Sequence, residues 1–200
     1  MPLDRLTTSL RRAVAIVAGA NLAYFCVEFW VAHSIGSVAL FADSIDFLED
    51  TSVNLLILVA LGWSVANRAR VGMVLAGLLM VPAGAALWTA WEKLGEPSVP
   101  AASLLGLTGF GALVVNLGCA LLLARFRAAE GSLTKAAFLS ARNDALANVA
   151  IILAGSLTLF WPSVWPDVIV GIGIAVINAD AAVEVWRAAR RERDGGKLRA

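Results

Sequence analysis

The sequence predicts an all-α integral membrane protein with six transmembrane helices and both termini in the cytoplasm. Three observations predict this: the composition, the lengths of the apolar segments and the distribution of the basic residues. Hydrophobic residues occupy 60% of the 200 positions, and the mean hydropathy is +0.79. These values lie far above those of a soluble globular domain.

Six apolar segments are long enough to cross a bilayer, whose core of about 30 Å needs about 20 mostly apolar helical residues. The expected spans are 12–33, 37–63, 70–92, 101–125, 135–160 and 164–188. Their connections are short, so we expect one six-helix transmembrane domain over 1–188 and a short basic cytoplasmic tail over 189–200. The first span follows Arg11 and Arg12 as a secretory signal would, but its apolar run continues to residue 33. We therefore expect a retained helix.

Basic residues concentrate on one side of the predicted membrane. That side carries Arg5, Arg11, Arg12, Arg68, Arg70, Arg125, Arg127, Lys135, Arg187, Arg190, Arg191, Arg193, Lys197 and Arg199. The opposite side has Lys93, and Arg142 falls within a span. The positive-inside rule therefore places both termini in the cytoplasm, and the seven tryptophans near span ends are typical of an aromatic belt. We expect the basic tail to anchor to anionic lipid, with docking of a partner as the alternative.

Other classes of function receive no support from the charge or the cysteines. A net charge of +1 gives no indication of nucleic acid binding. Cys26 and Cys119 are the two cysteines, and two such residues within spans provide no disulfide framework or zinc-finger spacing. We expect both to be small buried apolar residues.

Acidic residues interrupt the second span in the stretch LFADSIDFLED, residues 40–50. Asp46 and Asp50 are one helical turn apart and share a face, and Asp43 lies on the same side. Each charged acid at bilayer depth costs about 2.5–3.5 kcal/mol on insertion scales. We therefore expect these acids to face water, protons or metal; the role of Glu49 is undecided.

The fifth span repeats the pattern in SARNDALANVA, where Ser140, Asp144 and Asn148 form one stripe at four-residue spacing. Ionisable residues within spans usually mark an ion path, whereas protonated carboxyls can also simply hold helices together. Acidic stripes on two helices favour the ion path. For Glu28 we expect pairing with Arg142, with a place along the access path as the alternative.

Clustered carboxylates repel one another, and a divalent cation relieves that repulsion while displacing protons. Such a site exchanges metal for protons by its own electrostatics. This chemistry is expected of a proton-coupled metal transporter. Asn21 and Asn116 in other spans either extend the polar cavity or form bonds between helices.

At these residues the sequence resembles the cation diffusion facilitator family of divalent metal–proton antiporters. GSVALFADSIDFLEDTSVNLL resembles the family's second helix, whose metal-binding (H/D)-x-x-x-D pair maps onto Asp46 and Asp50. AAFLSARNDALANVAIILAG resembles the fifth helix, whose H-x-x-x-D pair maps onto Ser140 and Asp144. WEKLGEPSVP and WPDVIVGIGIAVI add support, and the resemblance covers essentially all six helices.

Ser140 is a departure, because the family usually has histidine there and the sole histidine, His33, is expected in an outer loop. The resemblance therefore implies an oxygen-only metal site. Its ligands would be Asp46, Asp50 and Asp144 with Ser140, Asn143 or water, and the second-shell or pathway residues would be Asp43, Glu49, Asn143 and Asn148.

Carboxylate, hydroxyl and water ligands suit Mn²⁺ and Mg²⁺, and zinc also accepts carboxylates. On family grounds Zn²⁺ is the first expectation, with Cd²⁺, Co²⁺, Mn²⁺ and Fe²⁺ as further candidates and H⁺ as the counter-ion. No prosthetic group is expected.

A second departure is the short tail, because family members commonly carry a cytoplasmic metal-sensing, dimerising domain after the sixth helix. The resemblance then implies a homodimer formed through membrane helices, with the third and sixth as candidates. A bacterial inner (plasma) membrane fits the compact chain.

The resulting hypothesis is efflux of a zinc-like cation by proton antiport with alternating access, which makes the protein a secondary active transporter and not an enzyme. One alternative is a non-transporting metal-binding or regulatory membrane subunit. A membrane enzyme is the other, but no G-x-G-D surrounds Asp46 or Asp144 and no D-G-x-x-A-R element occurs.

Overall fold

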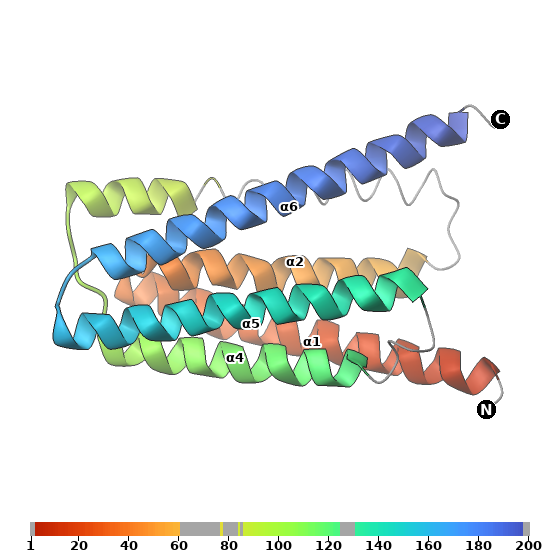
Figure 1. Cartoon of the computed structure of the whole chain (residues 1–200), viewed down its shortest axis with the longest axis horizontal. Helices are drawn as coiled ribbons and strands as arrows, with labels where there is room; N and C mark the ends of the chain where they lie inside the picture. Colours follow the sequence, from red (N-terminus) through yellow and green to blue (C-terminus); the bar gives the residue numbers. More distant parts are fainter. Residues whose placement is uncertain (1–2, 61–76, 78–83, 85, 125–130, 198–200) are drawn as a thin grey trace.

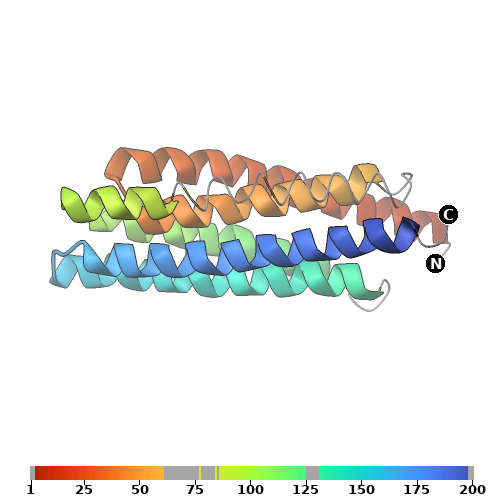
Figure 2. The same cartoon turned by 90° about the horizontal axis from the view of Figure 1, so that it is seen from above.

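The protein is a bundle of long helices, most of which lie side by side along one axis, while the last helix diverges from the others toward its C-terminal end (Figures 1 and 2). The computed structural model describes residues 3–60, 77, 84, 86–124 and 131–197. Its helices are α1 (Leu3–Ile35), α2 (Val38–Ala60), α4 (Ala102–Ala124), α5 (Gly131–Phe160) and α6 (Trp165–Lys197). A further helical segment occupies 86–95, and no strand occurs among the described residues. The predicted all-α fold is confirmed.

Three helices extend beyond the expected spans. α1 begins at Leu3, α5 begins at Gly131 and α6 continues to Lys197. Most of the predicted tail 189–200 is therefore a continuation of α6. Most of the expected third span, 70–92, lies outside the described residues.

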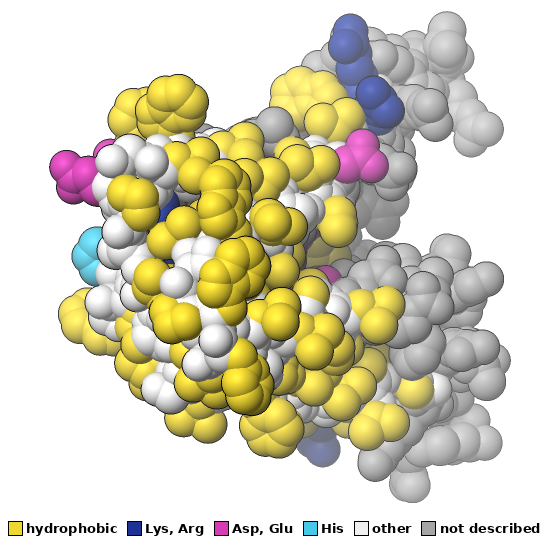
Figure 3. Space-filling view, turned by 60° about the vertical axis from the view of Figure 1, so that its left-hand side comes forward, with side chains coloured by type: hydrophobic (Ala, Val, Ile, Leu, Met, Phe, Trp, Pro, Cys, Tyr) yellow, Lys and Arg dark blue, Asp and Glu magenta, His cyan; other side chains and the backbone are white. Residues whose placement is uncertain are grey.

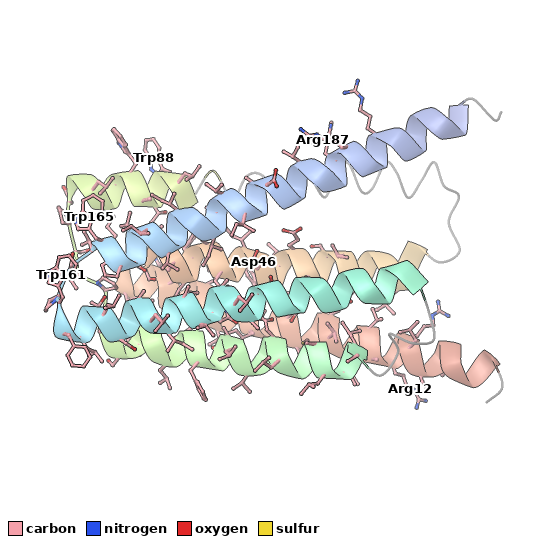
Figure 4. The ribbon with its side chains drawn as sticks, viewed as in Figure 1. Arg12, Asp46, Trp88, Trp161, Trp165 and Arg187 are labelled. Carbon is pink, nitrogen blue, oxygen red and sulfur yellow. The ribbon has the colours of Figure 1, made fainter. Side chains whose placement is uncertain are left out.

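Both termini lie at one end of the bundle, here called the terminal end (Figure 1). The turns at 36–37, 96–101 and 161–164 lie at the opposite end, here called the loop end. Trp88, Trp161 and Trp165 gather at the loop end, whereas Arg12 and Arg187 lie toward the terminal end (Figure 4). An even number of spans places both termini on one side of the membrane, and the distribution of basic residues predicts the same arrangement.

The surface is suited to lipid. The face in Figure 3 is largely hydrophobic, and Trp30, Trp91 and Phe160 are more than 70% exposed. Thr8–Ile35 and Ala102–Ala124 are by themselves long and apolar enough to cross a bilayer. Cys119 is buried as expected, but the prediction for Cys26 is wrong, because its side chain is exposed on α1.

Small residues let the helices approach closely, as is common in membranes. A Cβ atom at Gly155 on α5 would lie 2.8 Å from the backbone nitrogen of Gly106 on α4. One at Gly171 on α6 would lie 2.6 Å from the carbonyl carbon of Val38 on α2. These contacts fix α4 against α5 and the start of α6 against the start of α2.

Candidate functional site

The acidic stripe of α2 lies inside the bundle. Asp43 is fully buried, and Asp46, Glu49 and Asp50 are half-buried. Asp46 lies between the two ends of the molecule, away from the tryptophans and the arginines (Figure 4). The acids are therefore at the depth of the apolar part of the bundle, as the sequence predicts.

Three of the expected ligands face a common region. Asp46 on α2 interacts electrostatically with Asp144 on α5, and Asp144 also interacts with Asp50. Asn21 on α1 donates a hydrogen bond from Nδ2 to Asp50 Oδ2 at 3.3 Å. Within the described part of the chain, however, no three His, Cys, Asp or Glu side chains are close enough together to hold a metal ion. The carboxylates share a region without forming a coordination shell.

Ser140 and Asn143 lie on α5, but their side chains are outside the described residues, as is that of Arg142. Ser140 lies one helical turn before Asp144, so the expected stripe requires a continuous helix over both residues. α5 provides that continuity. The ligand role of Ser140 and the supporting role of Asn143 stay predictions.

A chain of buried side-chain hydrogen bonds crosses three helices beside these acids. Asn116 on α4 donates from Nδ2 to Asn148 Oδ1 on α5 at 3.0 Å. Asn148 in turn donates from Nδ2 to Asp43 Oδ2 on α2 at 2.6 Å. All three side chains are at most 2% exposed. Asn116 therefore links two helices by a hydrogen bond, which is one of the two roles expected for it.

Glu28 on α1 is also fully buried, and its carboxyl group adjoins that of Asp43. Neither oxygen of Glu28 accepts a hydrogen bond from an N–H or O–H donor, and Oδ1 of Asp43 also has none. The expected pairing of Glu28 with Arg142 stays a prediction, because the Arg142 side chain lies outside the described residues. The neighbour of Glu28 is another acid.

The sequence reasoning missed a second polar cluster, here called the Asp167 cluster, which consists of Asp167, Lys93 and Ser37 at the loop end. Lys93 Nζ lies 2.8 Å from Asp167 Oδ2 and also donates to the Gly36 carbonyl oxygen at 2.5 Å. Ser37 Oγ donates to Asp167 Oδ1 at 2.5 Å. All three side chains are at most 5% exposed.

Asp167 also serves as a cap for α2, although it belongs to α6. It accepts the Val38 backbone N–H at 2.9 Å and the Ala39 N–H at 3.1 Å. Ser37 Oγ accepts the Leu40 N–H at 3.1 Å, as an N-cap residue does. The first turn of a helix has unsatisfied N–H groups that favour a carboxylate.

Two signals in the sequence could have indicated this cluster. Ser37 directly precedes an apolar helix, which is typical of an N-cap. Lys93 is the lone basic residue assigned to the outer side, and a buried lysine needs an acidic partner. A pocket of about 630 Å³ opens beside Lys93 and contains Glu92 and Glu96, but none of the expected metal ligands lines it.

Comparison with known proteins agrees with the fold. The sequence profile of the cation efflux transmembrane domain matches residues 14–192, which is most of the chain. No curated protein matches the chain significantly. The profile confirms the resemblance drawn from the second and fifth spans, and with it a transmembrane domain of six helices.

Proposed function

Because the chain belongs to the cation efflux family of transmembrane transport proteins, we propose that it exports a zinc-like divalent metal in exchange for protons. Transport would proceed by alternating access, in which each ligand stabilises the conformation that binds it best. The observation that carries this proposal is the electrostatic interaction between acids of two helices, in which Asp144 on α5 interacts with both Asp46 and Asp50 on α2.

The charge of these aspartates explains the exchange. Each can neutralise either a bound metal or a proton, so metal binding displaces protons and protons displace metal. A bilayer makes unpaired charge costly, and one of the two occupants therefore has to be present. A pH gradient across the membrane can then drive the metal in the opposite direction.

The proposed ligand shell contains oxygen atoms from Asp46, Asp50 and Asp144, completed by Ser140, Asn143 or water. Zn²⁺ is the preferred cargo on family grounds, with Cd²⁺, Co²⁺, Mn²⁺ and Fe²⁺ as further candidates. An all-oxygen shell would bind zinc less strongly than one with imidazole, since imidazole favours Zn²⁺ and oxygen ligands favour Mn²⁺. Weaker binding suits a transporter, which has to release its cargo.

We further propose a homodimer formed through the membrane helices and contacts with anionic lipid at the basic C-terminal end of α6. A bacterial inner membrane, with both termini in the cytoplasm, fits the distribution of charge. The alternative is a metal-binding or regulatory subunit that does not transport, which would retain Asp46 and Asp50 and would have lost turnover with the histidine that Ser140 replaces.

Proteoliposomes containing the full chain test this proposal. We expect divalent metal uptake under an imposed pH gradient, measured with a metal-sensitive dye across a panel of Zn²⁺, Cd²⁺, Co²⁺, Mn²⁺ and Fe²⁺. Asp50→Ala and Asp144→Ala should each reduce uptake to that of empty vesicles, because the site loses a charged ligand. Asp180→Asn, which removes an exposed acid of α6, should transport like the unmodified chain.

Retained transport in the Asp50→Ala or Asp144→Ala variant would exclude the proposed site. Metal binding without pH-driven flux in the unmodified chain would favour the non-transporting subunit.

Ser140→His tests the metal preference. The added imidazole should shift selectivity from Mn²⁺ towards Zn²⁺, measured as the ratio of the two uptake rates. An unchanged ratio would show that residue 140 does not contact the metal.

A further inference from the structure

Glu28 and Asp43 form an acid pair that the proposed metal site does not use. Their side chains are fully buried, and they come from different helices, α1 and α2. Their carboxyl groups are adjacent and interact electrostatically. Three of the four carboxyl oxygens of the pair, both of Glu28 and Oδ1 of Asp43, receive no hydrogen bond, and no ion pair to either acid occurs among the described residues.

The arrangement of the two carboxyl groups favours a shared proton between them. Two ionised carboxylates side by side repel each other, and a buried charge without a partner costs far more than a neutral group. A proton shared between the two acids removes one charge and supplies the missing hydrogen bond, with one carboxyl donating and the other accepting. A larger cation would need further ligands, and the described residues form no cluster of three metal-ligating side chains.

The surroundings fix the geometry of Asp43. The side-chain amide of Asn148 donates a hydrogen bond to Asp43 Oδ2, and the side-chain amide of Asn116 donates one to Asn148 Oδ1. Oδ1 is left for Glu28. The asparagines therefore orient one acid of the pair toward the other without supplying any charge.

Other ionisable groups face the pair from two sides. Tyr24 lies one turn before Glu28 on α1 and donates its hydroxyl to the Thr108 carbonyl oxygen of α4 at 2.6 Å. Asp46 on α2 interacts electrostatically with both Glu28 and Asp43, and Asp144 on α5 interacts with Asp43. A divalent cation among the proposed metal ligands would thus act on the pair through the field, since opposite charge favours the ionised form of an acid.

We propose that Glu28 and Asp43 are a proton-binding site, separate from the metal ligands, that supplies one of the counter-transported protons. This inference rests on the proposed antiport. When the metal binds at the aspartates, the pair releases its proton as H⁺ and both carboxylates become ionised. When the metal leaves, one proton returns to the pair.

Proton release on metal binding tests the proposal. The full chain in detergent is titrated with Zn²⁺ or Mn²⁺ in weakly buffered solution, and a pH dye counts the protons released for each metal bound. In Glu28→Gln the count should fall by one, while the metal still binds. The double variant Glu28→Gln/Asp43→Asn should lose no more protons than the single variants, because the pair holds one proton in total.

Two further variants distinguish loss of the proton-binding acid from a general effect of a substitution in α1. Glu28→Asp keeps an acid and should keep the unmodified proton count. Cys26→Ser changes an exposed residue one half-turn away and should leave both the count and the metal affinity unchanged.

Transport supplies a second measurement. Removing one proton from the exchange should lower the limiting metal accumulation about tenfold for each pH unit of imposed gradient, since one unit per proton corresponds to a factor of ten. An unchanged proton count in Glu28→Gln, with metal binding intact, would overturn the acid-pair proposal while leaving the antiport standing. No metal binding by the unmodified chain would overturn the proposed function itself.

Discussion

Two buried polar clusters in the same molecule differ in how fully their atoms are bonded. In the Asp167 cluster at the loop end, Asp167 accepts hydrogen bonds from Lys93, Ser37 and two backbone amides. In the acid pair midway along the bundle, three of the four carboxyl oxygens of Glu28 and Asp43 receive none. A satisfied cluster holds helices together, whereas unsatisfied acids within a membrane span are typical of functional sites.

The two clusters also connect different parts of the chain. Asp167 links α6, the start of α2 and the segment that contains Lys93, all at one end of the bundle. The acid pair joins the middles of α1 and α2 and continues through Asn148 and Asn116 into α5 and α4. Stability should therefore depend mainly on the first cluster, and proton coupling mainly on the second.

The largest effect on stability is expected from Asp167→Ala. It leaves the ammonium group of Lys93 buried without a counter-charge and two amides of α2 without an acceptor. Loss of one partner from a buried ion pair costs about 3–5 kcal/mol. Thermal and denaturant unfolding in detergent micelles, followed by circular dichroism, measures the loss.

His33→Ala is the matched control, because His33 is exposed at the same end of the bundle. Its effect should stay within about 0.5 kcal/mol. If the two variants unfold alike, the Asp167 cluster does not stabilise the bundle.

Two glycines of α6 test how closely α6 packs against α2, and their expected effects are smaller. Gly171→Ala forces a Cβ against the Val38 backbone and should destabilise the bundle by about 1–3 kcal/mol, as overpacking does. Gly173→Ala has no atom within 4 Å of its added Cβ and should gain up to about 1 kcal/mol from helix propensity. Unfolding of the two variants side by side gives the difference, and a common sign would show that α2 and α6 are not packed this closely.

The smallest effect is expected at the acid pair. In Glu28→Gln an amide N–H can donate to Asp43 Oδ1 in place of the shared proton. One hydrogen bond then replaces another, so the free energy of unfolding should change by less than the roughly 0.5–1.5 kcal/mol that a hydrogen bond contributes. A marked loss of stability would mean that Glu28 is a structural residue.

Several features of the site follow from spacing along a single helix. The alignment of Asp43, Asp46 and Asp50 needs only the helical repeat, and so does the stripe of Asp144 and Asn148. The helix of each stripe is observed, and the acids of α2 are buried or half-buried as expected. Arginines lie toward the terminal end because the positive-inside rule acts on the sequence itself, and tryptophans lie near span ends because both bilayer interfaces favour them.

The partner of each polar group required the tertiary structure. Helix packing places Glu28 beside Asp43, which the pattern of neither helix predicts. Lys93 and Asp167 are separated by 74 positions, and no periodicity connects residues on different helices. Which carboxylates are satisfied is decided by the rotation and separation of neighbouring helices, which local patterns do not encode.

The sequence by itself thus determined the membrane class, the described helices and the two acidic stripes, because each depends on composition or on the repeat of one helix. The tertiary structure alone decided that Asp167 caps α2 from another helix and that Glu28 lies beside Asp43 without a hydrogen bond to either of its oxygens. Both depend on side chains that meet across helix interfaces. Their hydrogen bonds, made or missing, distinguish the cluster that holds the bundle together from the pair that we propose binds a proton.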